Sequence, residues 1–255
     1  NFDGAKGFMV GAENTGLASM FIMMNYERLT MGLQGIGGAE LAYQNATAYT
    51  LDRIQGRADS GIQEPNKAAD PIVFHADVRR MLLNAKTISE ASRCFAMYVA
   101  KELDTNKYTD DAEARKAADD RVALLTPVAK AFLTDRGLEA SIDAQQCFGG
   151  HGYIREWGME QIVRDTRISQ IYEGTNGIQS LDLLGRKVVK NGGAFVTTYV
   201  QEMRDFANNM NADHAIKQAI LTSADKLEDL TKAVVAAAVV NKDEINGCAV
   251  DYLRS

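Results

Sequence analysis

Residues 143–179 read DAQQCFGGHGYIREWGMEQIVRDTRISQIYEGTNGIQ, and they contain two glycine-bearing segments on either side of a short helical pattern. The first is FGGHGYIREWG at 148–158; within it, the small residues of GGHG at 149–152 allow backbone N–H groups to approach an anion, so this tetrapeptide is a candidate phosphate cradle. Glycines between helices more often serve only as a connection. The second, IYEGT at 171–175, places an acid, Glu173, directly before a glycine. Both segments are candidate functional loops.

The sequence on both sides of this stretch is helical in character. Only three prolines occur in 255 residues. Apolar residues recur at helical spacing and predict helices at 17–54, 72–103, 112–147, 159–170, 176–189, 194–210 and 213–241. We expect Asn176 to cap the helix after IYEGT. An all-α bundle of long helices follows from this pattern.

Glycines also mark the beginning of the chain. Residues 1–15 are glycine-rich and contain the apolar triplet FMV at 8–10, which predicts a strand remnant before the first helix. Four more glycines, at 32, 35, 37 and 38, lie within the first predicted helix and would weaken it in isolation. Tight packing against a neighbouring backbone is the expected compensation.

Composition and charge exclude several function classes. The chain is 46% hydrophobic and 24% charged, with a net charge of −6, so it resembles a globular protein whose surface would repel a nucleic-acid backbone. No run of 18 apolar residues occurs, and we expect no membrane span. Three widely spaced cysteines favour reduced thiols and a cytoplasmic location.

The sequence contains no recognised motif for a metal site or for a catalytic triad. A carboxylate-bridged metal in a helical bundle needs Glu-x-x-His pairs, and none precedes His75, His151 or His214. HExxH and GxSxG are absent as well. We therefore expect no metal site.

The motifs of 143–179, taken jointly, resemble the acyl-CoA dehydrogenase family. The family pattern is a Gln-x-x-Gly-Gly-x-Gly loop, an Arg-Asp pair, Ile-Tyr-Glu-Gly-Thr and a nearby Ile-Gln. The matching residues here are Gln146, Gly149, Gly150, Gly152, Arg164, Asp165, Ile171 to Thr175, Ile178 and Gln179.

The resemblance implies a domain organisation. Residues 1–15 would end the family's middle β-domain, 16–190 would form its C-terminal four-helix bundle, and 191–255 would be an additional helical extension. Such an extension is typical of a subgroup that includes bacterial enzymes for long-chain or 3-methylmercaptopropionyl thioesters. The first residue, Asn1, is not a methionine, and we expect both ends to be cuts within a longer protein.

The resemblance also implies a reaction. The family removes an α-proton and a β-hydride from an acyl-CoA thioester and leaves a trans-2-enoyl-CoA. An α-C–H beside a thioester is a weak acid, so a positioned carboxylate and stabilisation of the enolate are both needed. Glu173 matches the base, and an apolar pocket would raise its affinity for a proton. Gly174 matches the residue whose backbone N–H holds the thioester oxygen, together with a flavin hydroxyl.

Other positions carry over as cofactor or substrate contacts. The expected FAD contacts are Arg53, Gln146, Gly149, Gly150 and Thr175. Arg53 would reach the pyrophosphate across a dimer interface, since a planar guanidinium pairs with two phosphate oxygens. The expected substrate contacts are Asn25, Arg28, Tyr172 and Gly174. A structural ion pair with Glu27 or a neighbour is the alternative for Arg28, and a helix-terminal surface arginine is the alternative for Arg53.

The implied partners are an acyl-CoA substrate, an electron-transferring flavoprotein and a second copy of the chain in a homodimer or larger homo-oligomer. An acyl-CoA oxidase, which passes electrons to oxygen, shares the fold and the glutamate. A non-catalytic or DNA-associated relative is the alternative from another class; the intact IYEGT and the acidic charge disfavour it. We expect this chain by itself to hold FAD weakly and not to turn over.

Overall fold

The structure, a computed structural model, describes residues 2–255 apart from the side chains of residues 18, 21 and 22. Its regular secondary structure is helical, and no strand forms within the described range. The helices are α1 (Gly16–Asp52), α2 (Ala76–Tyr108), α3 (Ala112–Cys147), α4 (Met159–Arg167), α5 (Asn176–Leu181), α6 (Ala194–Asn209), α7 (His214–Val240) and α8 (Lys242–Arg254). The all-α expectation is confirmed.

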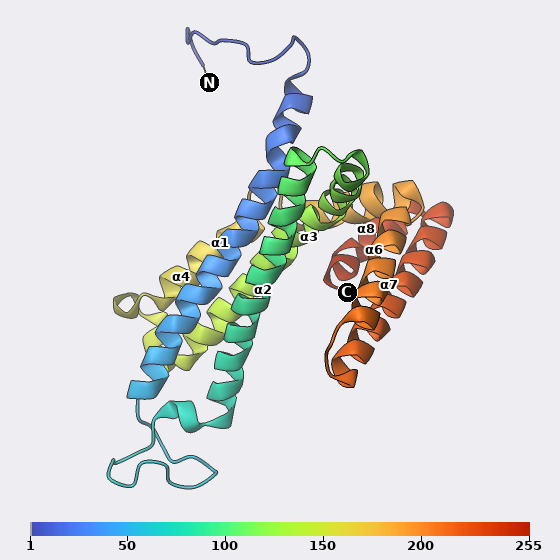
Figure 1. The fold of residues 1–255 in the computed structure, drawn as a ribbon. Coiled ribbons are helices and arrows are strands. Elements are labelled where there is room, and N and C mark those ends of the chain that lie inside the picture. The colour runs from blue at the N-terminus through green and yellow to red at the C-terminus, as the bar shows by residue number, and fades with distance from the viewer. Residues whose placement is uncertain (1) are drawn as a thin grey trace.

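Three long helices form the frame of the bundle. α1, α2 and α3 lie side by side, and α4 packs against α1 and α3 (Figure 1). Their shared core is apolar and includes Leu29, Ile36, Val99, Leu125 and Leu133. None of the helices described is long and apolar enough to cross a membrane.

α1 and α3 approach unusually closely because glycines face each other. A Cβ on Gly137 would overlap the backbone of Gly35, and a Cβ on Gly32 would lie 2.8 Å from the carbonyl oxygen of Ala129. The expected packing against a neighbouring backbone is therefore confirmed at positions 32 and 35. At Gly38 the neighbour is instead the side chain of Thr166 on α4, and at Gly37 the Cβ position has no neighbour within 4 Å among the described residues, so the expectation is wrong at both.

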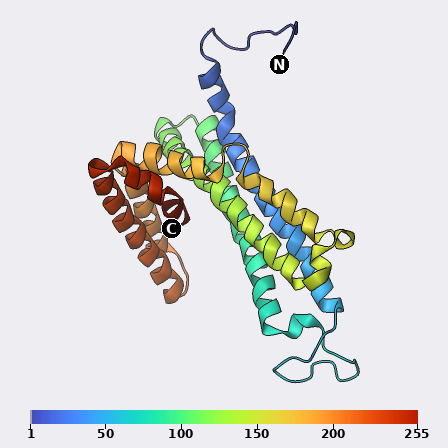
Figure 2. The ribbon, with the colours of Figure 1, turned by 180° about the vertical axis from the view of Figure 1, so that it is seen from behind.

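The last three helices form a second group beside the bundle, seen from behind in Figure 2. α6 pairs with α7, while α8 turns back onto α5 and the π-helix Asp182–Val188. The sequence prediction missed two features here. It continued α5 as a regular helix to 189, and it did not identify α8, whose first turn is capped when Asn241 accepts a hydrogen bond from the backbone N–H of Asp243.

Residues 2–15 are irregular and extend away from the bundle. The strand predicted at 8–10 is not formed, because a strand needs a partner to pair its backbone groups and these residues have none in the described chain. Their assignment to the end of a β-domain remains a prediction.

The connection from α1 to α2 is an ordered loop organised around one carboxylate. Asp70 is fully buried and accepts hydrogen bonds from the backbone N–H groups of Ala58, Gln63 and Glu64 at 2.8–3.0 Å, and from Arg57 at 3.1 Å. Burial would raise the pKa of Asp70, but these donors outweigh it and lower the pKa to about 2. The loop therefore holds a fixed shape beside the end of α1.

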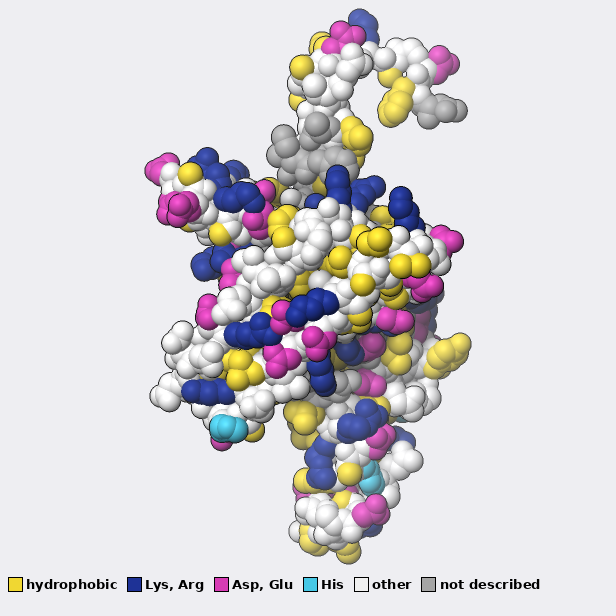
Figure 3. Space-filling model, turned by 90° about the vertical axis from the view of Figure 1, so that its right-hand side faces the viewer, with side chains coloured by type: hydrophobic (Ala, Val, Ile, Leu, Met, Phe, Trp, Pro, Cys, Tyr) yellow, Lys and Arg dark blue, Asp and Glu magenta, His cyan; other side chains and the backbone are white. Residues whose placement is uncertain are grey.

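Surface charge is mixed on the face shown in Figure 3, where basic and acidic side chains alternate over the helices. This distribution agrees with the scattered charges of the sequence.

Candidate functional site

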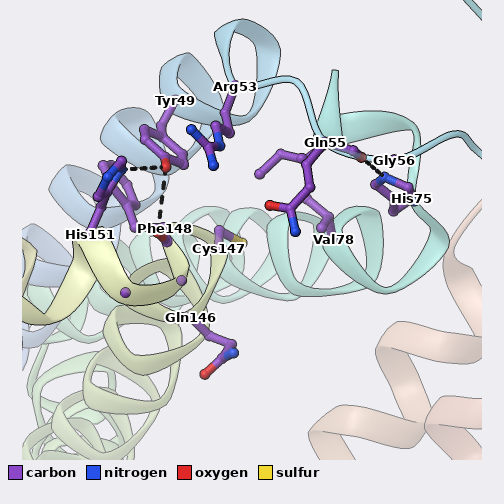
Figure 4. Close-up of a pocket in the computed structure, with 13 residues that line it drawn as sticks. Tyr49, Arg53, Gln55, Gly56, His75, Val78, Gln146, Cys147, Phe148 and His151 are labelled. Atoms are coloured by element: carbon purple, nitrogen blue, oxygen red, sulfur yellow. Dashed lines mark hydrogen bonds between the residues drawn. The ribbon is translucent and has the colours of Figure 1, made fainter. Parts of the chain in front are cut away.

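A cleft opens where α1 ends and α3 meets the first glycine-bearing segment. Its volume is about 570 Å³, and we call it the glycine-rich cleft. Figure 4 shows that its lining residues come from α1, from the loop after it, from α2 and from the end of α3. The lining residues are Tyr49, Arg53, Gln55, Gly56, Ile72, His75, Val78, Gln146, Cys147, Phe148, Gly149, Gly150 and His151.

The structure brings together four of the five residues expected to contact FAD. Arg53 ends α1, and its exposed side chain forms no hydrogen bond or ion pair with any described residue. Gln146 lies exposed in the last turn of α3. Gly149 has a positive φ of 55°, and added Cβ atoms on Gly149 and Gly150 would point into open space. The backbone of this segment is thus accessible from the cleft.

Aromatic side chains stabilise the wall of the cleft. Tyr49 stacks on Phe148 with ring centroids 4.0 Å apart, and Trp157 stacks on His151 at 4.6 Å. The Tyr49 hydroxyl lies 2.8 Å from Nδ1 of His151. Segment 148–158 forms two 3-10 turns rather than an open loop. Stacking of this kind gives a rigid wall at small entropic cost.

The second region is residues 170–176, which we call the Glu173 loop. Glu173 has a φ of 54°, and Gly174 follows with 78°. A left-handed backbone is common for glycine but unfavourable for glutamate, and such strain concentrates at functional sites. The Glu173 side chain is exposed, so the apolar pocket expected around it is not formed by the described residues alone.

Several contacts hold this loop. The Tyr172 hydroxyl donates to Gln34 of α1, and the Thr175 hydroxyl donates to the carbonyl of Gln170 at 3.1 Å. Gln179, which is fully buried, donates from Nε2 to the carbonyl of Gly174 at 3.1 Å. A side chain on Gly174 would lie 2.6 Å from that same nitrogen, so only glycine fits there. Thr175 thus lies in this loop, away from the other expected FAD contacts.

The predicted cap of α5 is wrong. Thr175 occupies the N-cap position without a side-chain hydrogen bond, and Asn176 is the first helical residue. The Asn176 amide turns instead toward α3, where it donates to Thr134 Oγ1 at 2.9 Å and to Asp135 at 2.7 Å. These buried partners outcompete the exposed backbone N–H groups of the short helix.

The expected substrate contacts on α1 lie at the start of the bundle. Asn25 is half-buried, and Arg28 donates to Asp182 of the π-helix at 2.8 Å. Both charged side chains are largely buried, and Nε of Arg28 has no hydrogen-bond partner among the described residues. Arg28 thus forms a structural ion pair, but its partner is Asp182 of the π-helix and not Glu27.

Sequence reasoning missed the aromatic wall and one buried lysine. Tyr49 lies one turn before Arg53, and Trp157 is the chain's single tryptophan; both were available signals. Lys130 is fully buried on α3, in line with the buried Thr126 and Thr134 at four-residue spacing. A charged residue on a buried helical face was the signal that could have identified it.

Comparison with known proteins matches most of the chain to one family. Residues 14–188 match the sequence profile of the family described as acyl-CoA dehydrogenase, C-terminal domain. The 3-methylmercaptopropionyl-CoA dehydrogenase of Ruegeria pomeroyi is 40% identical over 235 residues, which are 92% of this chain and 39% of that protein. A butyryl-CoA dehydrogenase of Syntrophomonas wolfei is 32% identical over 228 residues, covering 87% of this chain and 37% of its own length.

Solved structures agree in fold. Caenorhabditis elegans ACDH-11, in complex with C11-CoA, superposes with a TM-score of 0.71 over 96% of this chain and 39% of its own, at 18% identity. The butyryl-CoA dehydrogenase of Megasphaera elsdenii gives a TM-score of 0.55 over 69% of this chain and 39% of its own, at 26% identity. The chain thus spans about two-fifths of the relatives it matches.

Proposed function

Because this chain belongs to the acyl-CoA dehydrogenase family, whose members are FAD-dependent flavoproteins, we propose that the full-length protein converts a saturated acyl-CoA thioester to its trans-2-enoyl-CoA, with Glu173 as the base. The names of the relatives, a 3-methylmercaptopropionyl-CoA and a butyryl-CoA dehydrogenase, support this class of substrate. We further propose an electron-transferring flavoprotein and a second copy of the chain as partners.

The backbone of Glu173 is the single observation that supports this proposal most. This backbone is left-handed, while the Glu173 carboxylate is exposed. Hydrogen bonds from Tyr172 on one side and from Gln179 on the other anchor the loop. A solvated acid at an ordinary helix junction needs neither the strain nor the anchors. A base that must meet one α-proton needs both, because a misplacement of about 1 Å costs roughly 100-fold in rate.

The local chemistry fits proton removal from a thioester. Glu173 takes the proton as the α-C–H bond breaks, and the electrons of that bond move toward the thioester carbonyl. Gly174 leaves room beside the carboxylate, and its backbone N–H can donate to the thioester oxygen as negative charge develops there. The carbonyl of Gly174 accepts a hydrogen bond from Gln179. This contact fixes the peptide group that follows Gly174.

The residues of the glycine-rich cleft fit a dinucleotide. The guanidinium of Arg53, which has no partner among the described residues, and the open glycine backbone at Gly149 and Gly150 are the donors that phosphate oxygens require. We propose that Arg53, Gln146, Gly149 and Gly150 hold the nucleotide portion of FAD and that Thr175 lies at the flavin end. When bound, FAD accepts the β-hydride.

On the substrate side we propose Asn25, Arg28 and Tyr172. Asp182 neutralises Arg28, so Arg28 would act through hydrogen bonding rather than through net charge. Tyr172 would form part of the wall beside Glu173.

The test uses the full-length protein with FAD. Wild type and Glu173→Gln are assayed with butyryl-CoA and palmitoyl-CoA by 2-enoyl-CoA formation, with an artificial electron acceptor. Removing a general base should lower kcat by at least about 100-fold, while Glu90→Gln, an exposed glutamate of α2, should retain wild-type activity.

Retained turnover in Glu173→Gln would refute the base. Reduction of the artificial acceptor without peroxide release supports a dehydrogenase, whereas stoichiometric peroxide would identify an oxidase. An inactive wild type that holds no FAD would favour a non-catalytic relative.

A further inference from the structure

Lys130 lies fully buried in the middle of α3, directly beneath the Glu173 loop. Its ammonium group donates to the carbonyl of Ser169 at 2.7 Å and to Oδ1 of Asn176 at 2.8 Å. These two residues stand immediately before and at the end of the loop. One buried side chain therefore joins both ends of the segment that carries Glu173.

A second residue of α3, Asp135, completes the attachment of the loop. Oδ1 of Asp135 accepts from Nε2 of Gln170 at 2.7 Å and from Nδ2 of Asn176 at 2.7 Å. The other oxygen of Asp135 accepts from Arg254 of α8 at 2.7 Å. Lys130 and Asp135 therefore hold both ends of the loop on α3. Arg254 of α8 binds the same Asp135 carboxylate and supports this attachment.

The electrostatics show that this lysine is costly. Burial lowers the pKa of Lys130 to about 8, although the negative charges of Asp135 and Glu173 favour its charged form. An apolar side chain of similar length would fill the same space without this desolvation cost. Packing alone therefore gives no reason for a lysine here.

Lys130 is not placed to act on a substrate itself. Its nitrogen is enclosed, and two of its three protons are donated to Ser169 and Asn176. What it controls is the geometry of the loop above it.

We propose that Lys130 is a positioning residue, which fixes Glu173 for proton removal by holding Ser169 and Asn176 at the two ends of the loop. This inference rests on the proposed role of Glu173. Asn176 acts as the second half of the same device, since its amide accepts from Lys130 and donates to Asp135.

The test compares Lys130→Met and Asn176→Ala with Lys116→Met, an exposed lysine on the same helix, in the full-length protein with FAD. Two quantities are measured: amide hydrogen exchange of 170–176, and kcat and KM for the acyl-CoA that wild type oxidises fastest. We expect the amide exchange rates of the loop to rise by at least about ten-fold in both test variants, while the amides of α3 stay protected. We expect kcat to fall by at least about ten-fold, with KM changed by less than about three-fold.

The outcomes separate the two proposals. Unchanged loop exchange in Lys130→Met or, if that variant does not fold, in Asn176→Ala overturns the positioning role. So does a rise in KM without loss of kcat. Faster loop exchange with wild-type kcat also overturns it, provided Glu173→Gln is inactive; if Glu173→Gln is active, the proposed base fails instead.

Discussion

The glycine-rich cleft and the Glu173 loop flank the same short helix, α4, yet they are held in place by different chemistry. The wall of the cleft is a stack of aromatic rings, Tyr49 on Phe148 and His151 on Trp157. The loop rests on hydrogen bonds to a buried lysine and a buried carboxylate. The difference suits their proposed tasks, because a cofactor cradle needs a stiff surface, whereas a base needs one defined position.

The strongest test of this contrast is the pH dependence conferred by Lys130. Its pKa is lowered to about 8 by burial, against an ordinary value of 10.5 that applies in the unfolded chain. Between these two pKa values the unfolded chain binds more protons than the folded chain, so the free energy of unfolding rises with pH. The destabilisation caused by burying the lysine is therefore fully present below pH 8. Relative to Lys130→Met, wild type should gain about 3 kcal/mol across this window, at roughly 1.4 kcal/mol per pH unit.

Urea unfolding of both proteins from pH 8 to 10.5 measures this gain. A difference between them that does not change with pH would mean that the lysine is not desolvated. Trp157 carries no titratable group, so the difference in stability between Trp157→Phe and wild type should stay constant over this range.

A second prediction concerns the glycines of the two regions. Gly174 and Gly158 both have positive φ, 78° and 75°, but only Gly174 has a neighbour in the way of a side chain. Gly174→Ala should displace Gln179 and lower kcat by about 100-fold. Gly158→Ala should cost about 1–2 kcal/mol of stability through strain and leave kcat within about two-fold. Equal kinetic losses would show that strain, and not the position of the loop, controls activity.

The third and smallest effect belongs to the cleft. Arg53→Gln removes a charged hydrogen-bond donor that has no partner among the described residues, and we expect FAD to bind about ten-fold more weakly. At saturating FAD, kcat should stay within about three-fold of wild type. Arg93→Gln on α2, which faces Glu40, is the matched control. Loss of kcat at saturating FAD would place Arg53 in the same functional unit as Glu173, and the contrast between the regions would fail.

The sequence revealed the exposed parts of both regions better than their supports. Helix α3 was predicted at its observed bounds, and Arg53, Gln146, Gly149 and Gly150 line one cleft. Asn176 was misplaced because its short polar side chain suits an N-cap in the absence of a partner, and only the fold supplies Thr134 and Asp135. Lys130 reads as an ordinary helix residue until its neighbours are known. Local propensity cannot reveal a contact made across thirty or more residues.

The most direct test of the central claim isolates the proton step. A 3-thia-acyl-CoA has no hydrogen at the β-position, so it cannot lose a hydride, and only the exchange of its α-hydrogen with solvent D₂O remains to be followed by mass spectrometry. We predict that the full-length enzyme exchanges the α-hydrogen and that Glu173→Gln, at equal thioester occupancy, exchanges it at least about 100-fold more slowly. Exchange by Glu173→Gln at the wild-type rate would contradict the account.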